Sequence, residues 1–366
     1  MALGRLPGLR QLPGRLARPR PDTVLFESWH GRYSDSPRAL SEALHSRRPD
    51  VRQIWAAENA AIPPWAEAVR PGSAAYLAAL GSAGHVVANT HMPGYFRKRG
   101  PTRYVQTWHG TPLKRIGLDI PGGAAALGGY LDQLRDDVGK WDLLLSPNRF
   151  STEIFRTAFG YDGEILESGY PRNDLLASPA APAARERVRE RLGLGQATRA
   201  VLYAPTWRDG REFELGLDVA LFEQRLGEDT TLLLRLHPIV AANLGAVTSA
   251  RTLDVSGHPD ITELLLAADV LVTDYSSVMF DFAVTGRPMA FLAYDLADYR
   301  DALRGFYFDF EREAPGPIVA TTAELCDALE QPDEIHDAAY TRFVERFCPL
   351  DDGNASTRVI AALFQG

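Results

Sequence analysis

The sequence predicts an α/β protein built from two doubly wound domains, each with a parallel sheet. From Thr23 onward, short apolar and β-prone runs alternate with segments of helix length, which is typical of parallel sheets covered by helices on both faces. The length of 366 residues suits two domains. The proline- and alanine-rich stretch Ser178–Ala184 separates the two series of strands, so we expect the domain seam there.

Each predicted strand is a short run of apolar or β-branched residues, and helix-length segments lie between the runs. The runs of the first half are Val24–Phe26, Val51–Ala56, His85–Asn89, Tyr104–Thr107, Asp142–Leu145 and Glu164–Glu167. The runs of the second half are Ala200–Ala204, Thr231–Leu236, Val270–Thr273, Met289–Ala293 and Pro317–Ala320. The segments Pro37–Ser46, Ser151–Phe159 and Arg185–Leu192 are predicted helices.

These elements divide the chain into four parts. Residues 1–21 are a basic arm or linker, and residues 22–177 and 178–345 form the two Rossmann-like domains. Residues 346–366 form a C-terminal helix that we expect to pack back against the first domain.

The composition excludes several classes of protein. Hydrophobic residues make up 45% of the chain and charged residues 23%, which indicates a globular protein rather than a disordered or fibrous one. The net charge is −8, whereas nucleic-acid-binding proteins are usually basic, so we expect no nucleic-acid partner. Cys326 and Cys348 have no metal-binding or disulfide spacing, and free thiols fit a reducing cytoplasm. No apolar run reaches the roughly 18 residues of a membrane-spanning helix.

The first 21 residues differ from the rest, because they hold five arginines and no acid. These arginines are Arg5, Arg10, Arg15, Arg18 and Arg20. Leucines lie between them, so the segment could contact anionic lipid. Prolines and glycines interrupt any helical periodicity, which favours an arm or linker instead.

Polar clusters follow several predicted strands, where doubly wound sheets bind their ligands. His109 follows the run Tyr104–Thr107, beside Gly110 and Thr111, and can act as a general base. Lys114 and Arg115 come next and could neutralise phosphate. The alternative is a buried histidine satisfied by backbone, but the Gly-Thr-Pro turn and the cation pair favour a site.

Three clusters in the second half are also candidates. Arg235 and His237 end the run Thr231–Leu236 and point to the same side of the strand. Asp274, Ser276 and Ser277 follow the run Val270–Thr273, where two serines at a helix start form either an anion site or an ordinary cap. Arg208 follows the run Ala200–Ala204 and could bind an acidic ligand.

Three further polar segments are given structural interpretations. Serines and asparagine at Ser34–Ser36 and Ser146–Asn148 are interpreted first as helix caps. The turn-rich segment Gly169–Asp174 is interpreted as a structural turn near the domain seam.

Several common catalytic motifs are absent from the sequence. There is no phosphate-binding GxxxxGK[ST] loop, no GxGxxG after a strand, no GxSxG elbow and no CxxC, HExxH or clear DxD pattern. We therefore expect no nicotinamide or flavin cofactor and no metal site. The chemistry is expected to depend on histidines, cations and helix ends.

Long motifs connect the chain to a known family. They are Gln106–Gly117, Ser146–Tyr161, Ser168–Asp174, Tyr203–Asp209, Arg235–Pro238, Asp260–Ala283 and Tyr299–Val319. With them the chain closely resembles the CDP-glycerol glycerophosphotransferases, which prime and polymerise poly(glycerol phosphate) teichoic acids. The resemblance begins near Val24 and runs almost to the end. It implies the GT-B architecture, in which two Rossmann-like domains have parallel sheets facing across a cleft.

The resemblance also implies a reaction and its residues. CDP-glycerol would bind mainly on the second domain, and the acceptor on the first. A hydroxyl of that acceptor, a lipid-linked saccharide or a growing glycerol-phosphate chain, would attack the phosphorus nearer the glycerol and release CMP. His109 matches the family's general base, and His237 matches the histidine that contacts the donor pyrophosphate. Donor-site motifs contain Ser276, Ser277, Asp274, Arg208, Glu263 and Arg235. Lys114 and Arg115 would steer the anionic acceptor.

The family works on lipid-linked acceptors at the inner membrane face, so the resemblance implies a peripheral protein on the cytoplasmic face. Membrane contact through the N-terminal arginines then becomes as well supported as a linker. The protonated His237, the cations and the helix start at Ser276 would replace a metal, so activity should not need a divalent ion. A related donor, CDP-ribitol or a nucleotide sugar, and a catalytically silent scaffold stay open as alternatives.

Overall fold

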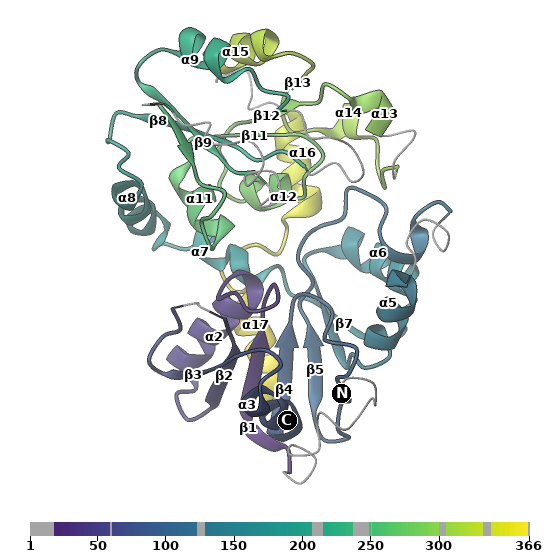
Figure 1. Cartoon of the computed structure of the whole chain (residues 1–366). Helices are drawn as coiled ribbons and strands as arrows, with labels where there is room; N and C mark the ends of the chain where they lie inside the picture. Colours follow the sequence, from purple (N-terminus) through teal and green to yellow (C-terminus); the bar gives the residue numbers. More distant parts are fainter. Residues whose placement is uncertain are drawn as a thin grey trace, which may run out of the picture. The chain divides into compact units, whose positions relative to one another are not determined.

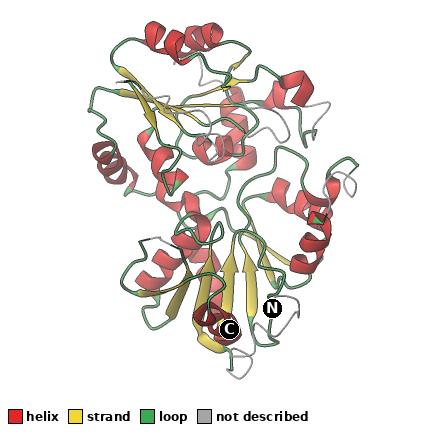
Figure 2. Cartoon of the chain, in the orientation of Figure 1, coloured by secondary structure: helices red, strands yellow, loops and turns green. Residues whose placement is uncertain are grey.

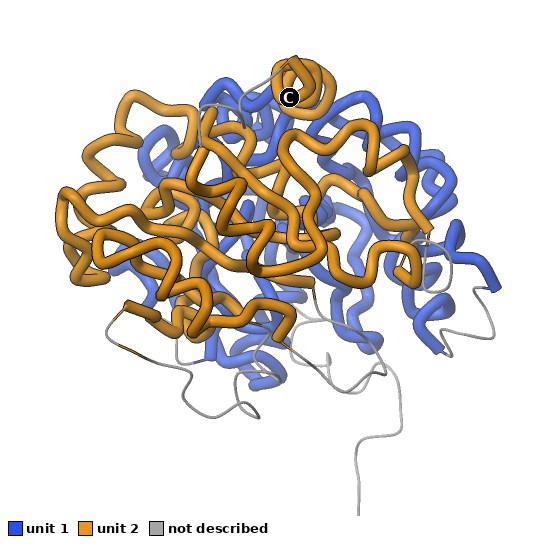
Figure 3. Tube along the Cα trace, turned by 90° about the horizontal axis from the view of Figure 1, so that it is seen from above, with its two compact units in different colours: residues 1–109, 117–174, 350–366 blue, residues 110–116, 175–349 orange. Residues whose placement is uncertain are grey.

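The structure, a computed structural model, describes residues 18–58, 61–122, 129–206, 215–236, 249, 251–299, 305–331 and 338–364. These residues form two compact units (Figure 3). Unit 1 comprises the described residues of Met1–His109, Gly117–Asp174 and Leu350–Gly366. Unit 2 comprises those of Gly110–Ile116 and Leu175–Pro349.

Unit 1 contains a seven-stranded sheet in which every pair of neighbouring strands is parallel (Figures 1 and 2). Its strands are β1 (Arg20–Glu27), β2 (Arg52–Ala56), β3 (Ala66–Val69), β4 (Ala83–Ala88), β5 (Arg103–Gln106), β6 (Leu143–Ser146) and β7 (Glu164–Glu167). The strand order is β3-β2-β1-β4-β5-β6-β7. Because the order reverses at β1, the topological switch point lies between β1 and β4.

Helices lie between several consecutive strands of unit 1, but in the described residues β3 follows β2 and β5 follows β4 without a helix. The helices are α2 (Asp35–Arg47), α3 (Ala74–Ser82), α5 (Tyr130–Val138), α6 (Arg149–Phe159) and α17 (Ala355–Phe364), with 3₁₀ turns η3 (Gly117–Asp119) and η4 (Pro171–Asn173). The C-terminal helix α17 packs against α2, and its Val359 and Ile360 join the core around Val24 and Phe26. The end of the chain thus completes the core of unit 1.

Unit 2 repeats this topology with a six-stranded parallel sheet in the order β10-β9-β8-β11-β12-β13. Its strands are β8 (Arg199–Tyr203), β9 (Thr230–Leu234), β10 (Thr252–Asp254), β11 (Val270–Thr273), β12 (Met289–Leu292) and β13 (Ile318–Val319). Its helices are α8 (Ala181–Arg191), α9 (Val219–Leu226), α11 (Ile261–Ala267), α12 (Val278–Ala283), α13 (Leu296–Asp298), α14 (Phe310–Glu313), α15 (Thr322–Glu330) and α16 (Ala338–Phe347), and α7 (Asp174–Ala177) begins at the unit boundary. The switch point lies between β8 and β11.

Two strands were not predicted, and both are edge strands. β3 and β10 stand at one end of their sheets and are four and three residues long. Their side chains are only partly buried, so they lack the continuous apolar run of the central strands, such as β4 and β6, which are buried along their whole length.

The boundary between the units differs from the predicted seam. The stretch Ser178–Ala184 is not a linker throughout, because α8 begins at Ala181 with a proline in its first turn. Residues 110–116, expected in the first domain, belong to unit 2. Among the expected caps, the Asn148 side chain accepts a hydrogen bond from the Ser151 N–H at 2.8 Å, but Ser34 makes no capping bond.

Within the described residues, no helix combines the length and the apolar character needed to cross a bilayer. Arg18 and Arg20 are exposed, and Arg20 already belongs to β1. The other arginines of the predicted arm lie outside the described residues.

Candidate active site

His109 lies at the switch point of unit 1, in the loop that follows β5. Its Nδ1 atom is 2.7 Å from the backbone oxygen of Asn89, the residue that follows β4. A carbonyl oxygen can only accept, so Nδ1 must carry the hydrogen. In the neutral ring the lone pair is therefore on Nε2, and this nitrogen can accept a proton from a substrate.

The surroundings of His109 keep its imidazole neutral. Burial lowers the pKa of His109 from 6.5 to about 4, and this effect outweighs the raising influence of the Asn89 carbonyl and of Asp35. At neutral pH the ring is thus uncharged, which a general base requires. This environment supports the predicted role of His109.

Backbone strain gathers around this histidine. In the part of the chain that the structure describes, the residues other than glycine with positive φ are Trp29, His30, Asp35 and Trp108, with φ between 45° and 62°. Trp29 and His30 lie in the loop after β1, Asp35 is the first residue of α2, and Trp108 precedes the histidine itself. Left-handed conformations are unfavourable for such residues and are concentrated at functional sites, so strain marks this end of the sheet independently of any motif.

Two indole rings enclose the imidazole. The Trp108 ring stacks on it at 4.2 Å between centroids, and the Trp29 ring lies tilted against it at 4.9 Å. The Asn89 side chain accepts a hydrogen bond from the Trp29 N–H and donates one to Ser28 Oγ. Asn89 thus holds both the imidazole and the loop that carries Trp29.

A buried ion pair supports the same loop. The Arg172 guanidinium lies 3.2 Å from both carboxylate oxygens of Asp35 and donates to the backbone oxygen of His109 at 2.8 Å. Burial by itself would raise the pKa of Asp35, but Arg172, the Ser36 amide and the Trp29 indole together hold that pKa below its usual value. Asp35 is therefore ionised at neutral pH and balances the charge of Arg172.

The residues that follow His109 belong to unit 2. Backbone hydrogen bonds join Leu113 to Tyr307 and Arg115 to Gly305, so this segment lies alongside residues 305–307. Lys114 Nζ lies 5.9 Å from the centre of the Tyr299 ring, and the Arg115 guanidinium lies 5.4 Å from that of Tyr307. Gly110 and Thr111 are buried. The two cations, predicted to accompany the base, are thus held by aromatic side chains of unit 2.

The serine cluster lies at the switch point of unit 2, after β11. Ser276 and Ser277 are half-buried, and Ser277 occupies the N-cap position of α12 without making a side-chain capping bond. Ser276 Oγ makes a long contact of 3.4 Å with the Val278 N–H. The interpretation as an ordinary cap therefore does not account for Ser277.

Asp274 has a structural function in this loop. Its buried carboxylate accepts hydrogen bonds from the backbone N–H groups of Thr206, at 2.8 Å, and of Tyr275, at 2.6 Å. These two bonds tie the segment after β8 to the segment after β11, which keeps both loops of the switch point together.

Two other predicted donor residues are engaged with protein groups. Arg235 Nη1 donates to the backbone oxygens of Val255, Ser256 and His258, so it holds the loop after β10. The Glu263 carboxylate pairs with Arg191 at 2.6 Å and with His258 at 3.4 Å. His237 and Arg208 lie outside the described residues.

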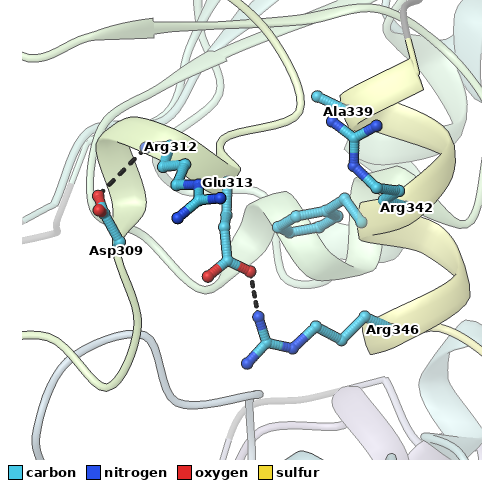
Figure 4. A pocket seen from close by; sticks show the side chains of 7 residues that line it. Asp309, Arg312, Glu313, Ala339, Arg342 and Arg346 are labelled. Atoms are coloured by element: carbon cyan, nitrogen blue, oxygen red, sulfur yellow. Dashed lines mark hydrogen bonds and ion pairs between the residues drawn. The ribbon is translucent and has the colours of Figure 1, made fainter.

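A separate hollow in unit 2 contains none of the predicted site residues. It lies between α14 and α16 and is lined by Asp309, Arg312, Glu313, Ala339, Arg342, Phe343 and Arg346 (Figure 4). Glu313 forms an ion pair with Arg346 inside it. Three arginines and two acids nearly balance, so this hollow lacks the concentrated positive charge of a phosphate site.

The sequence interpretation missed Trp29, Asn89 and Arg172, and treated the segment of Asp35 as a helix cap. Trp29 and Asn89 follow the two strands that flank the switch point. The rule that doubly wound sheets bind ligands beyond the carboxyl ends of their strands would therefore have found them. Arg172 lies in the segment interpreted as a structural turn, and no local pattern connects it to His109.

Comparisons with known proteins show the family to which the chain belongs. The family described as CDP-Glycerol:Poly(glycerophosphate) glycerophosphotransferase matches residues 13–365. The teichoic acid poly(glycerol phosphate) polymerase of Bacillus subtilis (strain 168) is 40% identical over 94% of this chain, which spans 48% of that relative. The teichoic acid glycerol-phosphate transferase of Staphylococcus aureus (strain NCTC 8325 / PS 47) is also 40% identical, over 95% of this chain and 94% of the relative. The chain thus spans about half the length of one curated relative and nearly all of the other.

A solved structure shows the same fold. The wall teichoic acid polymerase TagF superposes with a TM-score of 0.89 at 38% identity, covering 98% of this chain and 92% of that chain. Together with the two parallel sheets, this match confirms the predicted GT-B fold class. The chain belongs to the CDP-glycerol:poly(glycerophosphate) glycerophosphotransferase family.

Proposed function

We propose that this chain transfers glycerol phosphate from CDP-glycerol to a hydroxyl of a lipid-linked or polymeric glycerol-phosphate acceptor, releasing CMP. The product would be a teichoic-acid-like polymer of the cell envelope. The observation that carries the proposal is the neutral His109, whose Nδ1–H is committed to Asn89 and whose Nε2 is left as a base. Family membership supplies the substrate class.

The proposed reaction requires no covalent bond between the protein and the substrate. His109 Nε2 takes the proton of the acceptor hydroxyl as its oxygen attacks the phosphorus nearer the glycerol. The bond from that phosphorus to the bridging oxygen of the diphosphate breaks, and CMP leaves with the electron pair. Phosphoryl transfer depends mainly on in-line positioning and stabilisation of charge. A positioned base contributes about 10²–10⁴-fold.

The donor is assigned to unit 2. The half-buried hydroxyls of Ser276 and Ser277 would donate to the diphosphate, and His237 and Arg208 would supply positive charge. Asp274, Arg235 and Glu263 would act by holding the loops around the donor, since their side chains contact protein groups. Gly110, Thr111, Lys114 and Arg115 would guide the anionic acceptor.

We also propose that the chain works as a peripheral protein at the cytoplasmic membrane face. The support is the arginine-rich start of the sequence and the lipid-linked acceptor implied by the family. A variant lacking residues 1–17 leaves β1 whole, because β1 begins at Arg20. Co-sedimentation with vesicles containing anionic lipid should weaken in this variant and in high salt. Unchanged binding would remove this part of the proposal.

The main experiment incubates the full chain with a synthetic lipid-linked glycerol-phosphate acceptor and one donor at a time. CDP-glycerol, CDP-ribitol and a nucleotide sugar are compared, with CMP release and product mass as readouts. We expect CMP and a product heavier by glycerol phosphate. His109→Ala should lose activity about 10²–10⁴-fold. His45→Ala is the matched control, because His45 lies in α2 and stacks on Trp65 instead. Full activity of His109→Ala would refute the proposed mechanism.

A further inference from the structure

We propose that Trp29, Asp35 and Arg172 form a bracket that sets the position and the tautomer of His109, and that all three are positioning residues for the base. The catalytic part of this inference rests on the proposed function. The structural part stands on the contacts of unit 1 and can be tested separately.

The bracket holds the backbone of His109. Arg172 donates to the His109 backbone oxygen at 2.8 Å while it also pairs with Asp35. The side chains of Arg172 and Asp35 are 5% and 6% exposed. Water therefore competes little for these hydrogen bonds, and the direction of the guanidinium is fixed by the carboxylate.

The bracket also holds the imidazole ring. Trp29 Nε1 donates to Asp35 Oδ2 at 3.0 Å, and the Trp29 ring contacts the imidazole. The Trp29 backbone N–H donates to Asn89, whose own backbone oxygen accepts from His109 Nδ1. A continuous chain of contacts therefore runs from the His109 ring through Trp29, Asp35 and Arg172 to the backbone oxygen of His109.

The backbone of the bracket is strained, with φ of 45° at Trp29 and 62° at Asp35. A conformation this unfavourable persists only where the surroundings impose it. Here the Asn89 contact and the ion pair with Arg172 impose it. A histidine whose ring position and tautomer are fixed before the acceptor binds needs no rearrangement during the reaction. This is the advantage of a preorganised base.

The bracket places one negative and one positive charge near the imidazole. Asp35 favours its protonated form, whereas Arg172 and His91 disfavour it. His91 in turn lies 3.4 Å from the buried carboxylate of Asp137. Loss of the Asp35 charge would remove a charge that favours the protonated imidazole. It would also leave the positive charge of Arg172 uncompensated, and both effects should lower the pKa of His109.

The first test uses Asp35→Asn in the full chain, which removes the charge and keeps one of the two acceptor oxygens, Oδ2 for Trp29 Nε1 or Oδ1 for the Ser36 N–H. The ¹⁵N signals of the His109 ring, assigned with His109→Gln, report the tautomer and its titration without any substrate. We expect wild-type protein to show a protonated Nδ1, and Asp35→Asn to titrate at lower pH. The acid limb of kcat/KM should move in the same direction.

The second test uses Trp29→Phe, which keeps one aromatic ring and removes the Nε1 donor together with the second ring of the indole. Misplaced groups near a reacting centre cost up to about 10²-fold, so we expect kcat to fall about tenfold with the KM for CDP-glycerol unchanged. Trp65→Phe is the control. Trp65 is 39% exposed, as Trp29 is, and stacks on His45 at 4.3 Å.

Two outcomes would overturn the bracket. One is that folded Asp35→Asn and Trp29→Phe retain the wild-type ¹⁵N tautomer, titration and kcat. The other is that kcat falls while the tautomer and the titration stay as in the wild type, which would show a structural role only. If the ¹⁵N results hold but His109→Ala remains active, the proposed function fails and the bracket does not.

Discussion

The pH dependence of activity offers the sharpest test of the environment around His109. The perturbation is a change of pH from 8 to about 3 with the wild-type chain. A base with a pKa of about 4 is about 90% neutral at pH 5, whereas a histidine with the ordinary value of 6.5 is about 3% neutral. The structure thus predicts about thirtyfold more kcat/KM at pH 5 than an unperturbed histidine would allow.

The assay is CMP release at limiting CDP-glycerol and saturating acceptor. We expect a plateau from pH 8 down to about pH 5 and a tenfold fall per pH unit below the pKa. Trp fluorescence at each pH confirms that the chain stays folded. An acid limb centred near pH 6.5 in a folded chain would refute the argument that burial keeps this imidazole neutral.

The same shift links pH to stability. The folded-state pKa of His109 is depressed below its unfolded value of 6.5, so the unfolded chain binds more protons between pH 6.5 and about pH 4. The contribution of His109 to the free energy of unfolding is therefore fully present above pH 6.5, and it is lost as the pH falls from 6.5 to about 4. The loss approaches about 3 kcal/mol, and His109→Gln should lack it.

Three other perturbations have clear expected results. Arg172→Gln leaves the Asp35 charge buried without its partner and should destabilise unit 1 by about 3–5 kcal/mol. Hydrogen exchange in urea measures this loss. The control Arg48→Gln breaks an exposed ion pair and should destabilise the chain far less. The double change Ser276→Ala and Ser277→Ala should raise the KM for CDP-glycerol and leave the KM for the acceptor nearly unchanged, so equal effects on both would contradict the donor assignment. Activity should survive a chelator such as EDTA, and complete loss restored by magnesium would show that cations and the helix start do not replace a metal.

The sequence was sufficient where structure follows from local pattern. The central strand β11 has the predicted bounds, because a strand that is buried along its whole length needs a continuous apolar run. The edge strands β3 and β10 were missed, because an edge strand is only partly buried and a run of mixed residues suffices. The strand-end rule located His109 and the serine cluster, because ligand-binding loops of doubly wound sheets follow the strands.

The amino-acid order by itself determined the two parallel sheets, the family and the candidate base, since all three are encoded in short runs and contiguous motifs. Only the tertiary structure decided what surrounds that base. Asp35 and Arg172 are 137 positions apart, and no periodicity or spacing relates residues at such a separation. Their pairing, the tautomer of His109 and its depressed pKa arise from burial and contact, which exist only once the chain has folded.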